Sequence, residues 1–135
     1  MKRILLIGFM AAAILLPGVA AYAHHSFAAT YDESPAKRVT IEGKLLTFTF
    51  RNPHSFVDVQ APDKDGVMQR WIVEWGGAGV LGGQGITRDS LKAGDVLVVT
   101  GSPGRDVTEH RLRMVNLRRP SDGFSYGMKE GEKFD

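Results

Sequence analysis

The chain of 135 residues contains no cysteine, which excludes disulfides, thiolate metal sites and cysteine nucleophiles. No apolar run reaches the ~20 residues that a membrane-spanning helix needs. Charge of neither sign is in large excess, because the chain contains 17 Lys+Arg and 15 Asp+Glu. The sequence therefore gives no sign of the basic face that nucleic-acid partners require.

The first 23 residues have the pattern of a secretory signal peptide. Lys2 and Arg3 precede an apolar run over residues 4–16, and Ala21-Tyr22-Ala23 matches a cleavage site of the A-x-A kind. Cleavage would lower the number of Lys+Arg from 17 to 15, which equals the number of Asp+Glu. Nucleic-acid binding depends on contacts between basic side chains and phosphates, so a protein without excess positive charge is a poor candidate for it. We therefore expect a periplasmic protein that begins at His24, has no membrane span after cleavage and binds no nucleic acid.

Five later stretches alternate apolar and polar residues, as half-buried strands do. The first stretch changes phase between Gly43 and Leu46, which predicts a bulge or bend that lets one strand serve two sides of a small barrel. Thr87 and Gly94 are start and stop signals for a short helix over Arg88 to Lys92. The expected strands cover residues 38–50, 55–61, 67–75, 95–101 and 109–118.

This order of elements predicts an all-β fold with one short helix, namely a five-stranded OB-fold-like Greek-key barrel. An open sandwich of five or six strands is the alternative. Phe27 and Tyr31 lie four residues apart and could anchor the segment that precedes the barrel. We expect a signal peptide over 1–23, an extended segment over 24–37, the barrel over 38–119 and a flexible polar tail over 120–135.

Known catalytic patterns are missing. No Ser–His–Asp spacing of a hydrolase occurs. Residues 76–85 hold six glycines but lack the Gly-Lys-Ser/Thr ending of a phosphate-binding loop, so we expect them to allow tight turns or close backbone approach. The protein is therefore expected to be a binding module and not an enzyme.

Several motifs together resemble a known family. The chain is similar to a group of small exported bacterial proteins that are catalogued as a domain of unknown function, and the resemblance covers nearly all of the mature chain. It implies an OB-like barrel and export, but no established activity. The glycine-rich segment departs from what we expect of that group. The motifs are His24-His25-Ser26-Phe27-Ala28, Asn52-Pro53-His54, Trp71 with Glu74, and the run from Thr87 to Asp95.

Histidines at the expected mature terminus form the first candidate site. A chain that begins at His24 has a free amine beside the imidazoles of His24 and His25, and Cu(II) favours tetragonal nitrogen sites. As in a copper histidine brace, the His24 amine and ring with a ring of His54 or His25 would hold the metal. The alternative is an exposed terminus that chelates copper incidentally, with His54 as a turn residue that caps backbone groups. His110 is expected to be a solvated hairpin residue.

A second candidate site lies on the barrel face. OB-folds often use aromatic residues on strands 2 and 3 for binding, so Trp71 and Trp75 are candidate ligand-binding residues. Arg51 and Glu74 are candidate polar residues of the same site. Trp71 is also expected to help fill the core, and Glu74 to pair with Arg51 or Arg70.

The expected function is thus an exported binding module for copper, with no other cofactor. The main alternative is a metal-free accessory module that binds a small ligand, a glycan or a periplasmic partner protein. A redox enzyme of the histidine-brace type is a third reading.

Overall fold

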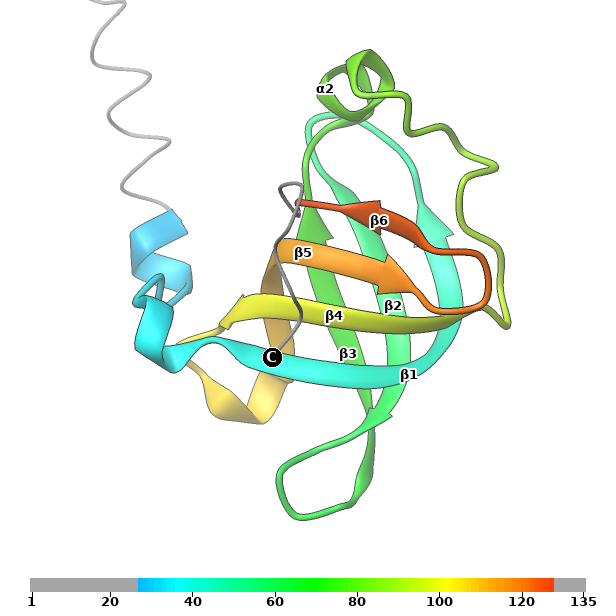
Figure 1. Cartoon of the computed structure of the whole chain (residues 1–135). Coiled ribbons are helices and arrows are strands. Elements are labelled where there is room, and N and C mark those ends of the chain that lie inside the picture. The colour runs from blue at the N-terminus through cyan, green and yellow to red at the C-terminus, as the bar shows by residue number, and fades with distance from the viewer. Residues whose placement is uncertain (1–26, 128–135) are drawn as a thin grey trace, which may run out of the picture. The chain divides into compact units, whose positions relative to one another are not determined.

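The computed structural model describes residues 27–127, of which residues 31–127 form an all-β domain that includes one short α-helix (Figure 1). The helical turn over residues 27–30 belongs to a separate compact unit, because the chain divides between Thr30 and Tyr31. No helix in the described part of the chain is long and apolar enough to cross a membrane. The elements are η1 (Pro35–Lys37), β1 (Val39–Thr49), β2 (Ser55–Pro62), β3 (Met68–Trp75), α2 (Ala78–Gly83), β4 (Val96–Pro103), η2 (Val107–Glu109), β5 (Arg111–Arg119) and β6 (Phe124–Tyr126).

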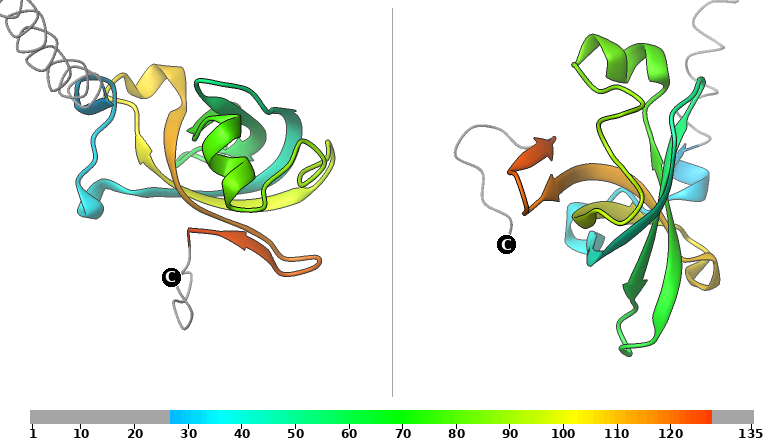
Figure 2. Two further views of the ribbon diagram at one scale, coloured as in Figure 1. Left: turned by 90° about the horizontal axis from the view of Figure 1, so that it is seen from above. Right: turned by 90° about the vertical axis from the view of Figure 1, so that its right-hand side faces the viewer.

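Strand pairing closes the sheet into a barrel. β1 pairs with both β2 and β4 in antiparallel fashion, β2 pairs with β3, and β4 pairs with β5. A short parallel pairing of β3 with β5 closes the sheet on itself, and β6 extends it beyond β5 (Figures 1 and 2). The resulting circuit β1-β2-β3-β5-β4 is that of a five-stranded OB-fold. The predicted fold is confirmed, and the open sandwich is excluded.

The bend in β1 lies where the sequence predicts it. Lys44 pairs with Gln60 of β2 and also with Val96 of β4, and the register with β2 shifts between Leu45 and Thr47. A Cβ at Gly43 would lie 2.1 Å from the carbonyl oxygen of Gln60, so only glycine allows the two strands to approach this closely. The first half of β1 thus joins β4, and the second half joins β2.

Alternation along the strands fills the barrel with apolar side chains. Trp71, Val73 and Trp75 of β3 point inward, whereas Glu74 lies on the outer face. The buried cluster extends over all five barrel strands and includes Leu81 of α2. Its other members are Ile41, Leu45, Val57, Val59, Ala61, Ile86, Leu91, Leu97, Val99, Leu112 and Leu117.

The helix prediction over Arg88 to Lys92 is wrong in position. Those residues form turns, in which the backbone N–H of Thr87 donates to the Ser90 hydroxyl, and the helix lies in the glycine-rich segment as α2. Tertiary contacts outweigh low helix propensity there. Leu81 is buried in the core, and a Cβ at Gly77 would lie 2.5 Å from a backbone oxygen of the β1–β2 turn. Seen from above, α2 covers one mouth of the barrel (Figure 2).

The segments that flank the barrel also differ from expectation. The tail predicted over 120–135 is ordered as far as β6, because Tyr126 packs edge-on against Trp75 with ring centroids 4.8 Å apart. Residues 128–135 lie outside the described residues. Ahead of the barrel, the segment expected to be extended contains the helical turn over 27–30 and η1, which starts at a proline.

Replacement of Leu81 by Ala should destabilise the protein by about 2–5 kcal/mol, because a fully buried leucine is lost from the core. Val80→Ala is a matched control on the same helix, since Val80 is 66% exposed and Leu81 is 0% exposed. The control should change the unfolding free energy by less than about 0.5 kcal/mol. Urea denaturation measures both values. Equal losses in the two variants would contradict the docking of α2 through Leu81.

Candidate functional site

A buried carboxylate lies on the outer face of β3, near the end of the strand. Glu74 pairs in register with Phe56 of β2 and with Arg113 of β5, so it lies where three strands run side by side. Its side chain is largely shielded from solvent although it points away from the barrel core. A buried carboxylate is costly unless it accepts hydrogen bonds or faces a positive charge. The neighbours of Glu74 supply both.

His54 contacts one oxygen of this carboxylate. The Nδ1 atom of His54 lies 2.6 Å from Oε1 of Glu74. His54 comes from the β1–β2 turn, in which the Ser55 hydroxyl accepts a hydrogen bond from the backbone N–H of Arg51 at 3.2 Å. Through its contact with Nδ1, the Glu74 carboxylate fixes the orientation of the His54 ring, as a carboxylate partner does for many metal-ligating histidines.

Tyr31 contacts the other oxygen. The buried hydroxyl of Tyr31 donates a hydrogen bond of 2.5 Å to Oε2 of Glu74. Backbone contacts hold Tyr31 against the barrel, since it bridges to Gly104 and the next N–H, that of Asp32, donates to the Pro103 carbonyl at 2.8 Å. Burial and the neighbouring Glu74 raise the pKa of the Tyr31 phenol above its ordinary value of 10.0, so the phenol remains a donor.

Arg111 supplies positive charge. One guanidinium nitrogen lies 3.7 Å from Oε2 of Glu74, and another lies 3.6 Å from Glu109. The guanidinium also lies over the Tyr31 ring, 6.0 Å from its centroid. We refer to Tyr31, His54, Glu74 and Arg111 as the Glu74 cluster.

The sequence anticipates only part of this cluster. Glu74 and His54 are predicted site residues, but the expected partners of Glu74, Arg51 and Arg70, lie elsewhere. Arg51 lies over the Phe56 ring, 5.5 Å from its centroid, and Arg70 forms an ion pair with Asp58. The true partners, Tyr31 and Arg111, were missed. The sequence indicated only that Tyr31 could anchor its segment on the barrel, because it lies four residues after Phe27.

The two tryptophan rings lie inside the barrel, whereas the Glu74 side chain lies on the outer face of β3. Trp75 is 4% exposed and packs against Phe48 and Tyr126, so its ring is not available to stack on a ligand. Trp71 is also buried, and its indole N–H donates to the Ala61 carbonyl at 3.3 Å. This confirms the prediction that Trp71 fills the core. One side of Trp71 nevertheless borders a cavity.

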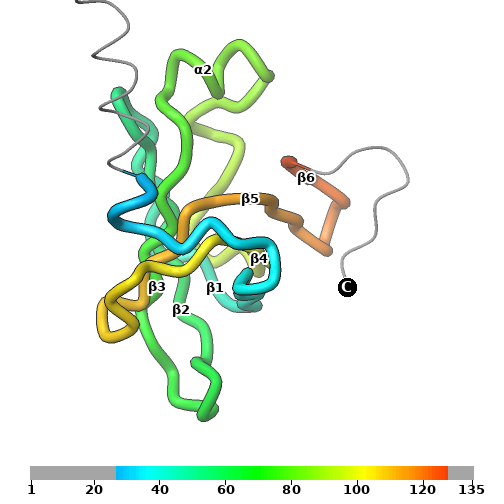
Figure 3. Tube along the Cα trace, turned by 90° about the vertical axis from the view of Figure 1, so that its left-hand side faces the viewer, coloured from blue at the N-terminus to red at the C-terminus, as the bar shows by residue number. Residues whose placement is uncertain are grey.

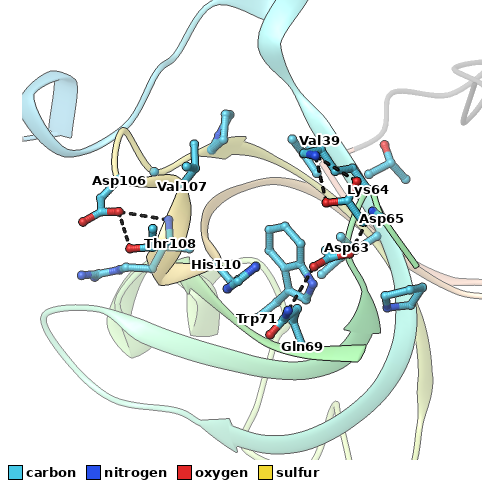
Figure 4. Close-up of a pocket in the computed structure, with 16 residues that line it drawn as sticks. Val39, Asp63, Lys64, Asp65, Gln69, Trp71, Asp106, Val107, Thr108 and His110 are labelled. Atoms are coloured by element: carbon cyan, nitrogen blue, oxygen red, sulfur yellow. Dashed lines mark hydrogen bonds and ion pairs between the residues drawn. The ribbon is translucent and has the colours of Figure 1, made fainter. Parts of the chain in front are cut away.

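That cavity has a volume of about 640 Å³. It lies between the β2–β3 loop and the connection from β4 to β5, and the rings of Trp71 and His110 point into it (Figure 4). The two rings meet edge to face with centroids 5.1 Å apart. His110 is therefore a wall residue of a cavity, which its charged neighbours in the sequence did not indicate.

The predicted terminal ligands His24 and His25 lie outside the described residues. Within residues 27–127, no group of three or more His, Cys, Asp or Glu side chains is placed to hold a metal ion. Of the predicted metal ligands, only His54 can therefore be located.

Metal-free protein should lose stability as the pH rises above 10.0, the ordinary pKa of the Tyr31 phenol. The folded state keeps the phenol proton where the unfolded state releases it, so alkaline pH favours unfolding. Tyr31→Phe cannot ionise and should show a flatter decline. Urea denaturation between about pH 8 and pH 11 compares the two slopes. Equal slopes would show that the Tyr31 phenol is not held protonated.

Comparisons with known proteins agree with the motif analysis. The family of unknown function DUF6152 matches residues 13–113. No curated protein matches the chain. Among solved structures, the chain is similar to the mitochondrial single-stranded DNA binding protein Rim1 of S. cerevisiae, with a TM-score of 0.45 and 12% identity over 62% of this chain and 92% of that chain. The family match covers most of the sequence, and the chain thus belongs to the family of unknown function DUF6152.

Proposed function

We propose that this protein is an exported binding module that holds a copper ion, with His54 as one ligand and the mature N-terminal histidines, His24 and His25, as the others. One observation carries the proposal. The Glu74 carboxylate contacts His54 with one oxygen and Tyr31 with the other. The same side chain therefore fixes a candidate ligand and the residue at which the N-terminal segment joins the barrel.

The geometry at His54 suits a metal ligand. With Nδ1 held by Glu74, Nε2 is the ring nitrogen that would bind the ion. A carboxylate in this position holds the ring plane of a metal-binding imidazole. Tyr31 and Arg111 in turn contact the carboxylate, so the His54 ring is held by a network of side chains that needs no ion.

Chain connectivity supports the contribution of the terminal histidines. His25 lies six positions before Tyr31 in the sequence, which limits its distance from Tyr31 to about 20 Å even in a fully extended chain. Tyr31 and His54 contact the same carboxylate. A chain long enough to bring His25 back past Tyr31 is therefore also long enough to bring it to His54.

The donor set favours copper. Imidazole nitrogens and a terminal amine, with no thiolate in the chain, are ligands that Cu(II) binds well in tetragonal geometry. The amine becomes available only if the leader is removed after Ala23. In this proposal, copper binding through the amine therefore depends on export and cleavage.

The first test is the position of cleavage. Protein recovered from the periplasm should have the mass of residues 24–135, because Ala21 and Ala23 fit the peptidase site. Intact mass spectrometry gives the answer directly. An uncleaved leader, or a terminus at Tyr22, would remove the amine ligand from the proposal.

The second test is copper affinity. Titration of the mature protein with Cu(II) should show one tight site, and His54→Ala should weaken it by about 10-fold or more. His110→Asn is the matched control, because His110 is the other histidine among residues 27–127 and its ring packs against Trp71. It should bind copper as the wild type does. A synthetic peptide of residues 24–31 should bind more weakly than the domain.

Two results would contradict a preorganised site. Either His54→Ala binds copper as tightly as the wild type, or the peptide matches the whole domain. The terminus would then be an incidental chelator. A metal-free accessory module would become the better description of the protein.

A further inference from the structure

The cavity beside Trp71 is a second candidate site that does not depend on metal binding. It lies at the end of the barrel opposite α2, where the β2–β3 loop and the β4–β5 connection extend past the strands (Figures 1 and 3). Its volume of about 640 Å³ is in the range of small-molecule sites, which hold ~300–1,000 Å³. The space is therefore large enough for a small organic ligand.

The interior of this cavity is mainly apolar. Trp71 and Ile41 are core residues that contribute the deeper part of the wall, and Val107 is exposed on η2. Two prolines, Pro62 and Pro103, complete the apolar wall. A flat hydrocarbon ring would bury its faces against these side chains and against the edge of the Trp71–His110 pair.

His110 is the polar group that this wall offers to a ligand. Its backbone adopts the left-handed conformation, with φ 48° and ψ 51°, which is uncommon for a residue other than glycine. Such strain is concentrated at functional sites. Its ring nitrogens make no hydrogen bond to any residue between Phe27 and Gly127, although the ring points into the cavity (Figure 4).

The other polar groups around the opening are already engaged. Asp63 accepts hydrogen bonds from two backbone N–H groups and from Gln69, and Asp106 accepts from Thr108. These bonds keep the pKa values of both aspartates below their usual range, so the opening carries negative charge at neutral pH. Lys64 pairs with Asp65 at 2.9 Å. Anionic ligands are therefore disfavoured.

A cationic ligand would be attracted by the aspartates at the opening but repelled by the positive charge of Arg111. Arg111 is among the residues that line the cavity, and its guanidinium contacts Glu74 and Glu109. A ligand without net charge avoids both the aspartates at the opening and the guanidinium. It can still use the hydrogen-bonding capacity of His110.

We infer that this cavity binds a small, uncharged aromatic molecule that carries a hydroxyl group. The aromatic ring lies against the apolar wall around Trp71, and the hydroxyl forms a hydrogen bond with His110. The class is that of simple phenols.

Four matched probes test the inference on the mature, metal-free protein: p-cresol, toluene, 4-methylbenzoate and 4-methylbenzylammonium. Two-dimensional NMR follows the backbone amides and the indole N–H of Trp71. We expect saturable shifts confined to the first residues of β1, the β2–β3 loop, β3 and the β4–β5 connection. p-Cresol should bind about 3- to 10-fold more tightly than toluene, which is what one neutral hydrogen bond provides. Both charged probes should bind more weakly than p-cresol.

Variants locate the interaction. His110→Asn should abolish the preference for p-cresol over toluene, and asparagine tolerates the left-handed backbone, so the loop should stay folded. Val80→Ala, on α2 at the opposite end of the barrel, should bind all four probes as the wild type does. The inference is overturned if no probe saturates, if toluene equals p-cresol, if a charged probe binds most tightly, or if the shifts map elsewhere.

Discussion

The parallel pairing of β3 with β5 is the contact on which the rest of the domain depends. It spans only three residue pairs, Ile72–Arg111, Val73–Leu112 and Glu74–Arg113. Without it the sheet would stay open and the apolar inner face would meet water. The same pairing brings Arg111 to Glu74 and places His110 beside Trp71. Barrel closure and both candidate sites therefore have one structural cause.

Local patterns were enough to predict most of the barrel. The phase change near Gly43 predicts the bend of β1, and alternation in the other strands predicts which side chains enter the core. The helix was misplaced because its cause is not local. α2 forms where Leu81 enters the core and where glycine fits against the β1–β2 turn, so packing outweighs the capping signals at Thr87 and Gly94. β6 was missed for a similar reason, since Tyr126 is held by Trp75.

The candidate site was predictable only in its individual residues. Glu74 stands out as a carboxylate between two core positions, and His54 as a histidine in a turn. Together with Tyr31 and Arg111, they come from the start of the domain, the β1–β2 turn, β3 and β5. Local sequence patterns do not reveal contacts between residues so far apart in the chain. Likewise, the sequence places His110 in a charged hairpin, whereas its left-handed backbone turns the ring towards Trp71.

The short strand β6 has a consequence for how the chain can be handled. The first residues of β5 pair with β3, and residues 117–119 at its other end pair with β6. A protein shortened before Phe124 would leave those N–H and C=O groups as an open strand edge, with the Trp75 ring uncovered beside it. Open edges recruit strands from other molecules. The last residues of the domain thus cover this edge, and truncated forms should self-associate more readily than the intact chain.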